Sequence, residues 1–321
     1  MIRKILLGIA IALLVIVGGL LLVINLRWDR TFEAPYPAIT ATTDSAVIAR
    51  GRYLAYGPAH CAACHVAPAD SAALGSGQQP PLSGGYAFHI PPGTFYVPNL
   101  TPDSATGIGR RSDGELARML RHSVRADGRS AVPFMESQDA SDEDLVALIS
   151  FLRSQPAVRH EVPAHKLSLL GKAVMSFMIT PVGPKATPPA TTPTEVGVAR
   201  GAYMANGLAS CVGCHTERSM ATGAFTGPAF AGGAPMEIPG DPTRELVPPN
   251  LTPDSATGRI ASWTEDAFVA RFRAGGAIPD SPMPWSFFGR TSDEDLRSIY
   301  RYLQSLAPVH RETGPSIRAK S

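Results

Sequence analysis

The sequence is poor in cysteine, in charged residues and in net charge. Four cysteines in 321 residues are too few for a disulfide scaffold of this length. Charged residues make up 17% of the chain and the formal net charge is only +2, so the chain lacks the basic surface with which a nucleic-acid-binding protein neutralises phosphates. By contrast, 30 glycines and 30 prolines predict long loops between few helices.

The long apolar run lies at the N-terminus. Residues 5–24 are almost entirely Ile, Leu, Val, Ala and Gly, and about 20 such residues can cross ~30 Å of hydrocarbon as a helix. A signal peptide, the alternative, has an apolar region of about 7–15 residues and a small-x-small cleavage site, which this segment lacks. We expect an uncleaved single-pass anchor over residues 1–30 in the inner (cytoplasmic) membrane. Arg3 and Lys4 precede the run, which predicts a cytoplasmic N-terminus and a periplasmic body.

The chain contains an internal repeat. Residues 50–65 recur as residues 200–215, and Pro98–Gly107 recurs as Pro249–Gly258. The repeat predicts two homologous units, each large enough to enclose a core. The predicted domains are the anchor at residues 1–30, the units at residues 46–160 and 195–310, a proline-rich linker at residues 161–194, and a basic tail at residues 311–321.

Each unit is expected to be all-α, with three main helices separated by long loops rich in Gly and Pro. Ser141 with Asp144, and Ser292 with Asp295, have the spacing of a capping box and predict the start of each closing helix. Ser112 starts a middle helix in the same way. Apolar residues then recur at i, i+3, i+4 and i+7, so one face of each closing helix is predicted to be buried.

In the predicted linker, the apolar segment Leu167–Ile179 is too short to span a membrane. We expect a helix that packs on a domain; contact with a partner or with the membrane surface is the alternative.

Both units carry a Cys-x-x-Cys-His motif, and the two motifs use all four cysteines. The residues are Cys61, Cys64 and His65 in the first unit, and Cys211, Cys214 and His215 in the second. Two thiols about one helical turn apart, followed by an imidazole, suit covalent attachment of haem with the histidine as an iron ligand. A zinc site needs four ligands close together, and a thioredoxin-like motif needs a βαβ context. The motifs therefore predict two covalently bound haem c groups.

A methionine in each unit is predicted to be the second axial ligand of the iron. Met283 lies between two prolines shortly before the last helix, where a thioether would bind iron and favour the reduced state. In the first unit Val132 aligns with Met283 and cannot bind iron, so Met135, three positions later, is the predicted ligand. The alternatives in the first unit are Met119, His122, His89 and an open face. Asn99 and Asn250 could bond near a haem propionate or only shape a turn.

With these residues, the chain resembles membrane-anchored dihaem c-type cytochromes with two class I domains. Its Pro-Asn-Leu-Thr-Pro-Asp stretches resemble those of the cytochrome subunits of membrane-bound alcohol, sugar-acid and aldehyde dehydrogenases. The resemblance implies two three-helix cytochrome c folds, with His65 and His215 as proximal ligands and Met135 and Met283 as distal ligands. It also implies that Gly51, Tyr53, Gly201 and Tyr203 pack against Phe151 and Tyr302 where the first and last helices cross. There are two departures, because those subunits usually carry three haems and the first methionine loop is short.

The resemblance implies an electron carrier and not an enzyme. The expected partners are the membrane, a donor such as a dehydrogenase subunit, and an acceptor such as a terminal oxidase, a reaction centre or a soluble cytochrome. The alternative function is a dihaem peroxidase, which needs one iron that can open to peroxide. A third option is a subunit that functions only inside a dehydrogenase or respiratory complex.

Overall fold

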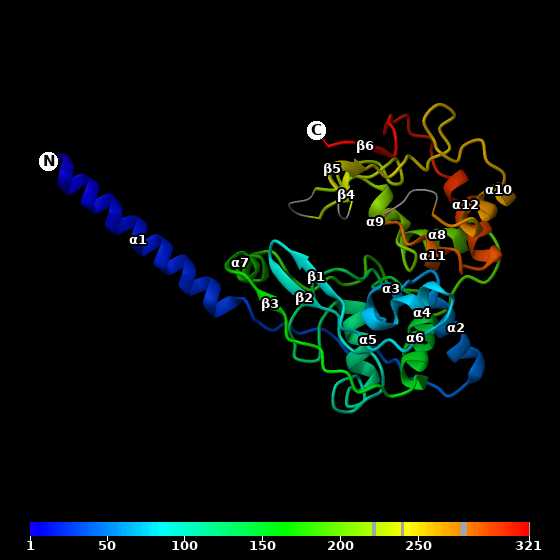
Figure 1. Ribbon diagram of the computed structural model, residues 1–321, viewed down its shortest axis with the longest axis horizontal. Helices are drawn as coiled ribbons and strands as arrows, with labels where there is room; N and C mark the ends of the chain where they lie inside the picture. The colour runs from blue at the N-terminus through cyan, green and yellow to red at the C-terminus, as the bar shows by residue number, and fades with distance from the viewer. Residues whose placement is uncertain (220–222, 239–240, 277–280, 321) are drawn as a thin grey trace.

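The computed structural model describes residues 1–321 except 220–222, 239–240, 277–280 and 321. The described part is mostly helical, with two small sheets. Helix α1 (Ile2–Arg27) projects away from a body made of two units, one on each side of the interface seen in Figure 1. Only 6% of the most apolar window of α1 is buried, and α1 is the one described helix long and apolar enough to cross a membrane.

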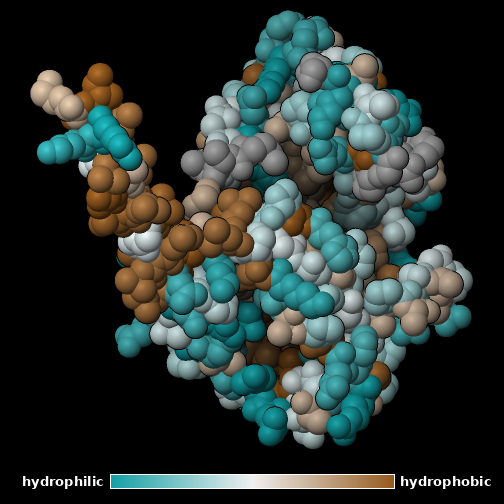
Figure 2. Space-filling view, turned by 60° about the vertical axis from the view of Figure 1, so that its left-hand side comes forward, coloured by the Kyte–Doolittle hydropathy of each residue, from teal (hydrophilic) through white to brown (hydrophobic). Residues whose placement is uncertain are grey.

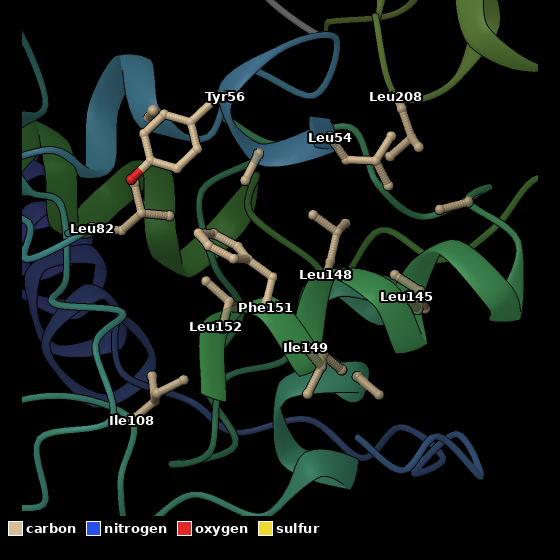
Figure 3. Close-up of a cluster of buried hydrophobic side chains, with 14 of the residues drawn as sticks. Leu54, Tyr56, Leu82, Ile108, Leu145, Leu148, Ile149, Phe151, Leu152 and Leu208 are labelled. Atoms are coloured by element: carbon tan, nitrogen blue, oxygen red, sulfur yellow. The ribbon is translucent and has the colours of Figure 1, made fainter. Parts of the chain in front are cut away.

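The first unit is built from six helical elements and a linker helix. They are α2 (Ser45–Tyr56), α3 (Ala62–His65), the 3₁₀ turn Pro68–Asp70, α4 (Ser71–Gly75), α5 (Asp113–His122), α6 (Asp142–Ser154) and α7 (Leu169–Phe177). The helix starts predicted at Ser112 and Ser141 are confirmed, because Ser112 forms a capping box with Glu115 and the Ser141 hydroxyl accepts from the Asp144 amide. The predicted apolar face of α6 is buried, and Figure 3 shows Phe151 and Leu148 under Tyr56 and Leu54 of α2.

The second unit repeats this arrangement. Its helices are α8 (Val198–Asn206), α9 (Cys211–His215), α10 (Glu265–Arg273), α11 (Trp285–Phe288) and α12 (Asp293–Gln304). The first helix crosses the last in both units through a glycine. A Cβ atom on Gly51 would lie 1.9 Å from the Ala147 carbonyl oxygen, and one on Gly201 would lie 1.8 Å from the Ser298 carbonyl oxygen. The crossings therefore need glycine because the backbones touch there.

Each unit also carries a three-stranded antiparallel sheet, which the sequence did not predict. The strands are β1 (Ala87–Ile90), β2 (Gly93–Tyr96) and β3 (Lys166–Leu167) in the first sheet, and β4 (Met236–Ile238), β5 (Asp241–Leu246) and β6 (Ile317–Ala319) in the second. A hairpin supplies two strands of each sheet, and the third comes from the chain after the last helix. Thus β3 lies in the predicted linker and β6 in the predicted tail.

The two units exchange tyrosines across their interface. Tyr53 of α2 donates to the Asp295 carboxylate at 2.5 Å and accepts from the Ser292 amide, at the start of α12. Tyr203 of α8 donates to Asp144 at 2.8 Å and accepts from the Ser141 amide, at the start of α6. The expected packing of Gly51 on Phe151 and of Gly201 on Tyr302 is confirmed. The tyrosine hydroxyl groups, about which the sequence predicted nothing, bond the start of the last helix of the other unit.

The interface is charged and buried at its centre. Asp144 is bound by the Nε and Nη2 atoms of Arg50 at 2.8 and 3.0 Å, and Asp295 is bound by the Nε atom of Arg200 at 2.6 Å. Neither aspartate is exposed. Burial, followed by the effect of the Asp144 carboxylate, raises the pKa of Tyr203. Each aspartate thus joins an arginine of its own unit to a tyrosine of the other.

Candidate functional site: a shared cavity lined by two Cys-x-x-Cys-His motifs

The two motifs have the same local geometry. In each, the short helix α3 or α9 carries the histidine at its C-terminal end. The Nδ1 atom of His65 donates to the Pro98 carbonyl at 3.1 Å, and that of His215 donates to the Pro249 carbonyl at 3.0 Å. This bond fixes the tautomer and leaves Nε2 as the free lone pair, as in histidines that bind metals.

His65 is buried, and His215 and the first cysteine of each motif are partly buried. Burial lowers the pKa of His65 to about 4, against the opposing bond to Pro98, and it lowers the pKa of His215. Both imidazoles are therefore neutral at physiological pH, which is the form that binds a metal. Burial raises the pKa of Cys61 and of Cys211 to about 12. All four cysteines are free thiols and form no disulfide.

Each proline whose carbonyl orients a histidine is followed by a buried asparagine. The Asn99 amide nitrogen donates to Thr106 at 3.1 Å and to the Val158 carbonyl at 2.8 Å, while its oxygen accepts from the backbone and hydroxyl of Thr101. Asn250 makes the corresponding four bonds in the second unit. Because both asparagines use their full bonding capacity internally, their role is to lock the loop. This settles the question left open by the sequence in favour of the turn, and no helix begins there.

Both motifs open into one cavity of about 1350 Å³. Single ligand pockets are typically about 300–1,000 Å³, so this cavity has room for more than one ligand. It is lined by both histidines, all four cysteines, Met135 and Met283. The structure therefore brings together every site residue that the sequence predicted. Of the alternatives in the first unit, Met119 also lines the cavity, whereas His89 bonds Thr94 in the β1–β2 hairpin and His122 lies outside the lining.

The cavity walls carry groups that suit a ligand with carboxylates. Six arginines face four acidic residues in the lining: Arg111, Arg125, Arg129, Arg218, Arg259 and Arg271 against Glu115, Asp127, Glu136 and Glu161. The buried Nε1 atom of Trp285 and the buried hydroxyl of Thr291 have no hydrogen-bond partner, and both residues line the cavity. Since buried polar groups are nearly always bonded, these two point to a ligand. Apart from Trp285, which lies two positions after Met283, these groups have no signal in the sequence.

The residues present fit haem better than zinc. Among the described residues, no group of three or more His, Cys, Asp or Glu side chains is arranged to hold a metal ion. A haem needs instead two thiols for covalent attachment, one neutral imidazole, an apolar cavity and cations for its propionates. Each motif supplies the thiols and the imidazole, and the shared cavity supplies the rest.

The methionine loop of each unit touches the motif of the other. Glu136, beside Met135, accepts a hydrogen bond from Ser210 at 2.6 Å, and Ser210 directly precedes Cys211. In the reciprocal contact, the ring of His60, directly before Cys61, packs edge-on against Phe288 of α11, with the ring centroids 5.6 Å apart. His60 and Ser210 both have positive φ angles, 38° and 49°. The sequence showed the repeat but not these contacts, because they depend on how the units are oriented.

Comparisons with known proteins show which proteins the chain resembles. No protein-family model matches the chain. Curated proteins do match the chain, and they show that it is a homologue of c-type cytochromes. It is homologous in particular to cytochrome c subunits of dehydrogenases, as the resemblance drawn from the motifs had indicated.

Three relatives illustrate the match. The cytochrome c subunit of the alcohol dehydrogenase (quinone) of Gluconacetobacter polyoxogenes is 31% identical over 302 residues, which are 86% of this chain and 59% of that subunit. The gluconate 2-dehydrogenase cytochrome c subunit of Pantoea cypripedii is 30% identical over 82% of this chain and 60% of its own length. A diheme cytochrome c-type protein of Cereibacter sphaeroides is 28% identical over 78% of this chain and 82% of its own length. The chain thus spans about 60% of the length of the dehydrogenase subunits it matches.

Proposed function

We propose that the protein is a membrane-anchored electron carrier that passes electrons from a dehydrogenase-type donor to a downstream acceptor by means of two covalently bound haem c groups. The observation that carries the proposal is the shared cavity, into which two Cys-x-x-Cys-His motifs and two methionines open. In this proposal residues 46–160 and 195–310 are tandem cytochrome c domains, and α1 is an uncleaved inner-membrane anchor with the body in the periplasm. The acceptor is a terminal oxidase, a reaction centre or a soluble cytochrome.

The chain's residues have distinct tasks in this function. The covalent attachments are Cys61, Cys64, Cys211 and Cys214, and the axial ligands are His65 and Met135 in the first domain and His215 and Met283 in the second. Bound haem iron supplies one-electron redox chemistry. The Pro98 and Pro249 carbonyls hold the two imidazoles in place, and the burial of His65 excludes water from the first of them.

The ligand assignment supports a carrier because it fills both axial positions in each domain. The dihaem peroxidase remains the second candidate, favoured by one observation: Met135 lies in a loop without a helix, whereas Met283 is followed at once by α11. A peroxidase would need an iron in the first domain that opens to peroxide.

A redox titration of the solubilised full chain, with spectra of the oxidised form, tests the proposal. We expect two low-spin irons with sulfur-to-iron charge-transfer bands. Met135→Ala and Met283→Ala should each remove one band, and Met178→Ala, an exposed methionine outside the cavity, should remove neither. A high-spin iron in the wild type with ready peroxide turnover would favour the peroxidase instead.

Gentle solubilisation distinguishes a free carrier from an obligate subunit. A free carrier elutes alone, whereas a subunit brings a catalytic dehydrogenase chain with it. The homology to subunits of dehydrogenases supports the second result.

A further inference from the structure

Helix α7 has one face packed on the protein and one face open. On the packed face, a Cβ atom on Gly171 would lie 1.9 Å from the Pro92 carbonyl oxygen, so the helix touches the turn of the β1–β2 hairpin. On the open face, Leu170 and Phe177 are 54% and 49% exposed. They are seven residues apart and therefore share one side of the helix. Nothing among the described residues covers this side.

The open face belongs to a larger apolar surface. Leu169 at its start and Met178 and Val182 after its end are 60%, 54% and 42% exposed. Figure 2 shows the apolar surface of α1 continuing onto the body of the protein, where α1 ends. Contiguous apolar surface of this kind marks a contact with another molecule or with a membrane.

Three contacts join α7 to the end of α1. The Ser176 hydroxyl donates to the Ile24 carbonyl at 3.1 Å, and the Lys172 ammonium lies 5.1 Å from the centre of the Trp28 ring. The Arg30 guanidinium donates to the Ile179 carbonyl just after α7. In Figure 1, α7 is seen nearly end-on while α1 runs across the picture. The two helices therefore cross, and α7 would lie along the surface of a membrane that α1 spans.

The charge of this segment suits a membrane surface. Between Glu161 and Glu195 the chain has three lysines and no acidic residue. Lys166 and Lys185, on either side of α7, are exposed, although Lys185 also lies 3.8 Å from the Asp139 carboxylate, and Lys172 lies beside Trp28. Lysines next to an anionic membrane strengthen its binding, and Trp residues favour the same interfacial layer.

We propose that α7 is an interfacial helix whose open face inserts between the headgroups and acyl chains of the membrane that α1 spans. The proposal rests on the proposed anchoring role of α1. It explains why a short apolar helix with an uncovered face is held against the end of a membrane-length helix. Met175 of α7, like Trp28, lines the shared cavity. Insertion of α7 would therefore hold the first unit's side of the cavity at the membrane surface.

A spin label placed on the open face tests the proposal. The full chain carrying Leu170→Cys is labelled and reconstituted in vesicles of phosphatidylcholine and phosphatidylglycerol, and its accessibility to oxygen and to a water-soluble nickel complex is measured. Leu14→Cys in the middle of α1 is the reference for the bilayer, and Val198→Cys, 46% exposed on α8, is the reference for water. The wild type, treated in the same way, corrects for reaction at native cysteines.

We expect the label at position 170 to have a several-fold higher oxygen-to-nickel ratio than the label at position 198, and a lower ratio than the label at position 14. Phe177→Asp should return the label at position 170 to water without moving the label at position 14, and Val198→Asp should change neither. The docking of α7 would be overturned if the label at position 170 had the same oxygen-to-nickel ratio as the label at position 198, or if Phe177→Asp left its ratio unchanged. In both cases a high ratio at position 14 would still show that α1 spans the membrane. A low oxygen-to-nickel ratio at position 14 would contradict both the membrane span of α1 and the docking of α7.

Discussion

The two halves of the molecule share their framework and differ in the loop that carries the methionine. Both have a glycine at the helix crossing, a histidine bonded to a proline carbonyl, and a buried asparagine that locks the loop. The halves also differ outside this loop, because the described part of the second unit has no counterpart of the 3₁₀ turn Pro68–Asp70, α4 or α7.

A helix follows the second methionine and packs on its own unit, while its Phe288 also contacts His60 of the other unit. Met283 is followed by α11, whose Trp285 packs on Phe272 with the ring centroids 5.5 Å apart and lies under the guanidinium of Arg271 at 4.0 Å. The first loop has no helix. Instead, Phe134 stacks on Phe88 of β1, and Glu136 reaches across to Ser210. The comparison teaches that both methionine loops contact the other unit, and that within its own unit one loop is held by a helix and the other by the β1–β2 hairpin.

The largest expected effect concerns the reciprocal aspartates. Asp144→Ala and Asp295→Ala should each lower the free energy of unfolding by about 3–5 kcal/mol, because each removes a buried carboxylate and leaves a partly buried arginine and a tyrosine hydroxyl of the other unit without their partner. Chemical denaturation of the full chain followed by circular dichroism measures this loss. Asp266→Ala, a control whose side chain is 82% exposed, should cost no more than about 1 kcal/mol. If only one of the two variants lowered the free energy of unfolding, the contacts across the interface would not be equivalent in the two directions.

The glycines at the helix crossings come next. Gly51→Ala and Gly201→Ala should each destabilise the protein by up to about 3 kcal/mol, because the new methyl group would overlap a backbone carbonyl and push the helices apart. The same denaturation experiment tests this. Gly75→Ala, where a Cβ atom meets nothing within 4 Å, should stay within about 1 kcal/mol of the wild type. An unchanged midpoint for either crossing variant would contradict the close approach.

The exchanged tyrosines should have a smaller effect. Tyr53→Phe and Tyr203→Phe keep the ring but remove the hydroxyl that bonds an aspartate and a backbone amide, at a cost of about 1–2 kcal/mol each. Denaturation midpoints compared with Tyr36→Phe, at an exposed position, measure the effect. Equal losses in the two variants would support the symmetric interface, whereas a loss confined to one would show that a single unit depends on the other.

The smallest change in stability should come from the contact between the first loop and the second motif. Glu136→Gln weakens the bond to Ser210 and should change stability by less than about 1 kcal/mol, because Glu136 is exposed. It should nevertheless loosen the Met135 loop. Titration with imidazole should show tighter binding to one haem in this variant and no change in Glu294→Gln, which removes a surface charge elsewhere. Unchanged imidazole binding would mean that Glu136 does not hold the loop.

Local signals in the sequence predicted the parts of the fold that depend on local structure. The capping serines Ser112 and Ser141 place two helix starts, and the apolar spacing identifies the buried face of each closing helix. The two Cys-x-x-Cys-His motifs locate both ends of the cavity. These features depend on residues a few positions apart, so periodicity and capping chemistry are enough to find them.

Features that depend on the packing of distant segments were beyond the sequence. The strands are two to six residues long, and β3 and β6 pair with hairpins about 70 residues earlier. Tyr53 bonds Asp295 across 242 positions. The local sequence pattern does not predict that these tyrosines reach the other unit. An internal repeat predicts the fold of each unit, but it does not predict how the two units are oriented.

The central claim is that each half carries one covalently bound haem, and intact-mass measurement of the denatured chain tests it most directly. The wild type should carry two haem equivalents that survive denaturation, and the paired variants Cys61→Ala/Cys64→Ala and Cys211→Ala/Cys214→Ala should each carry one. A wild-type chain that carries no haem after denaturation, or a pair of variants that both keep two, would contradict the account.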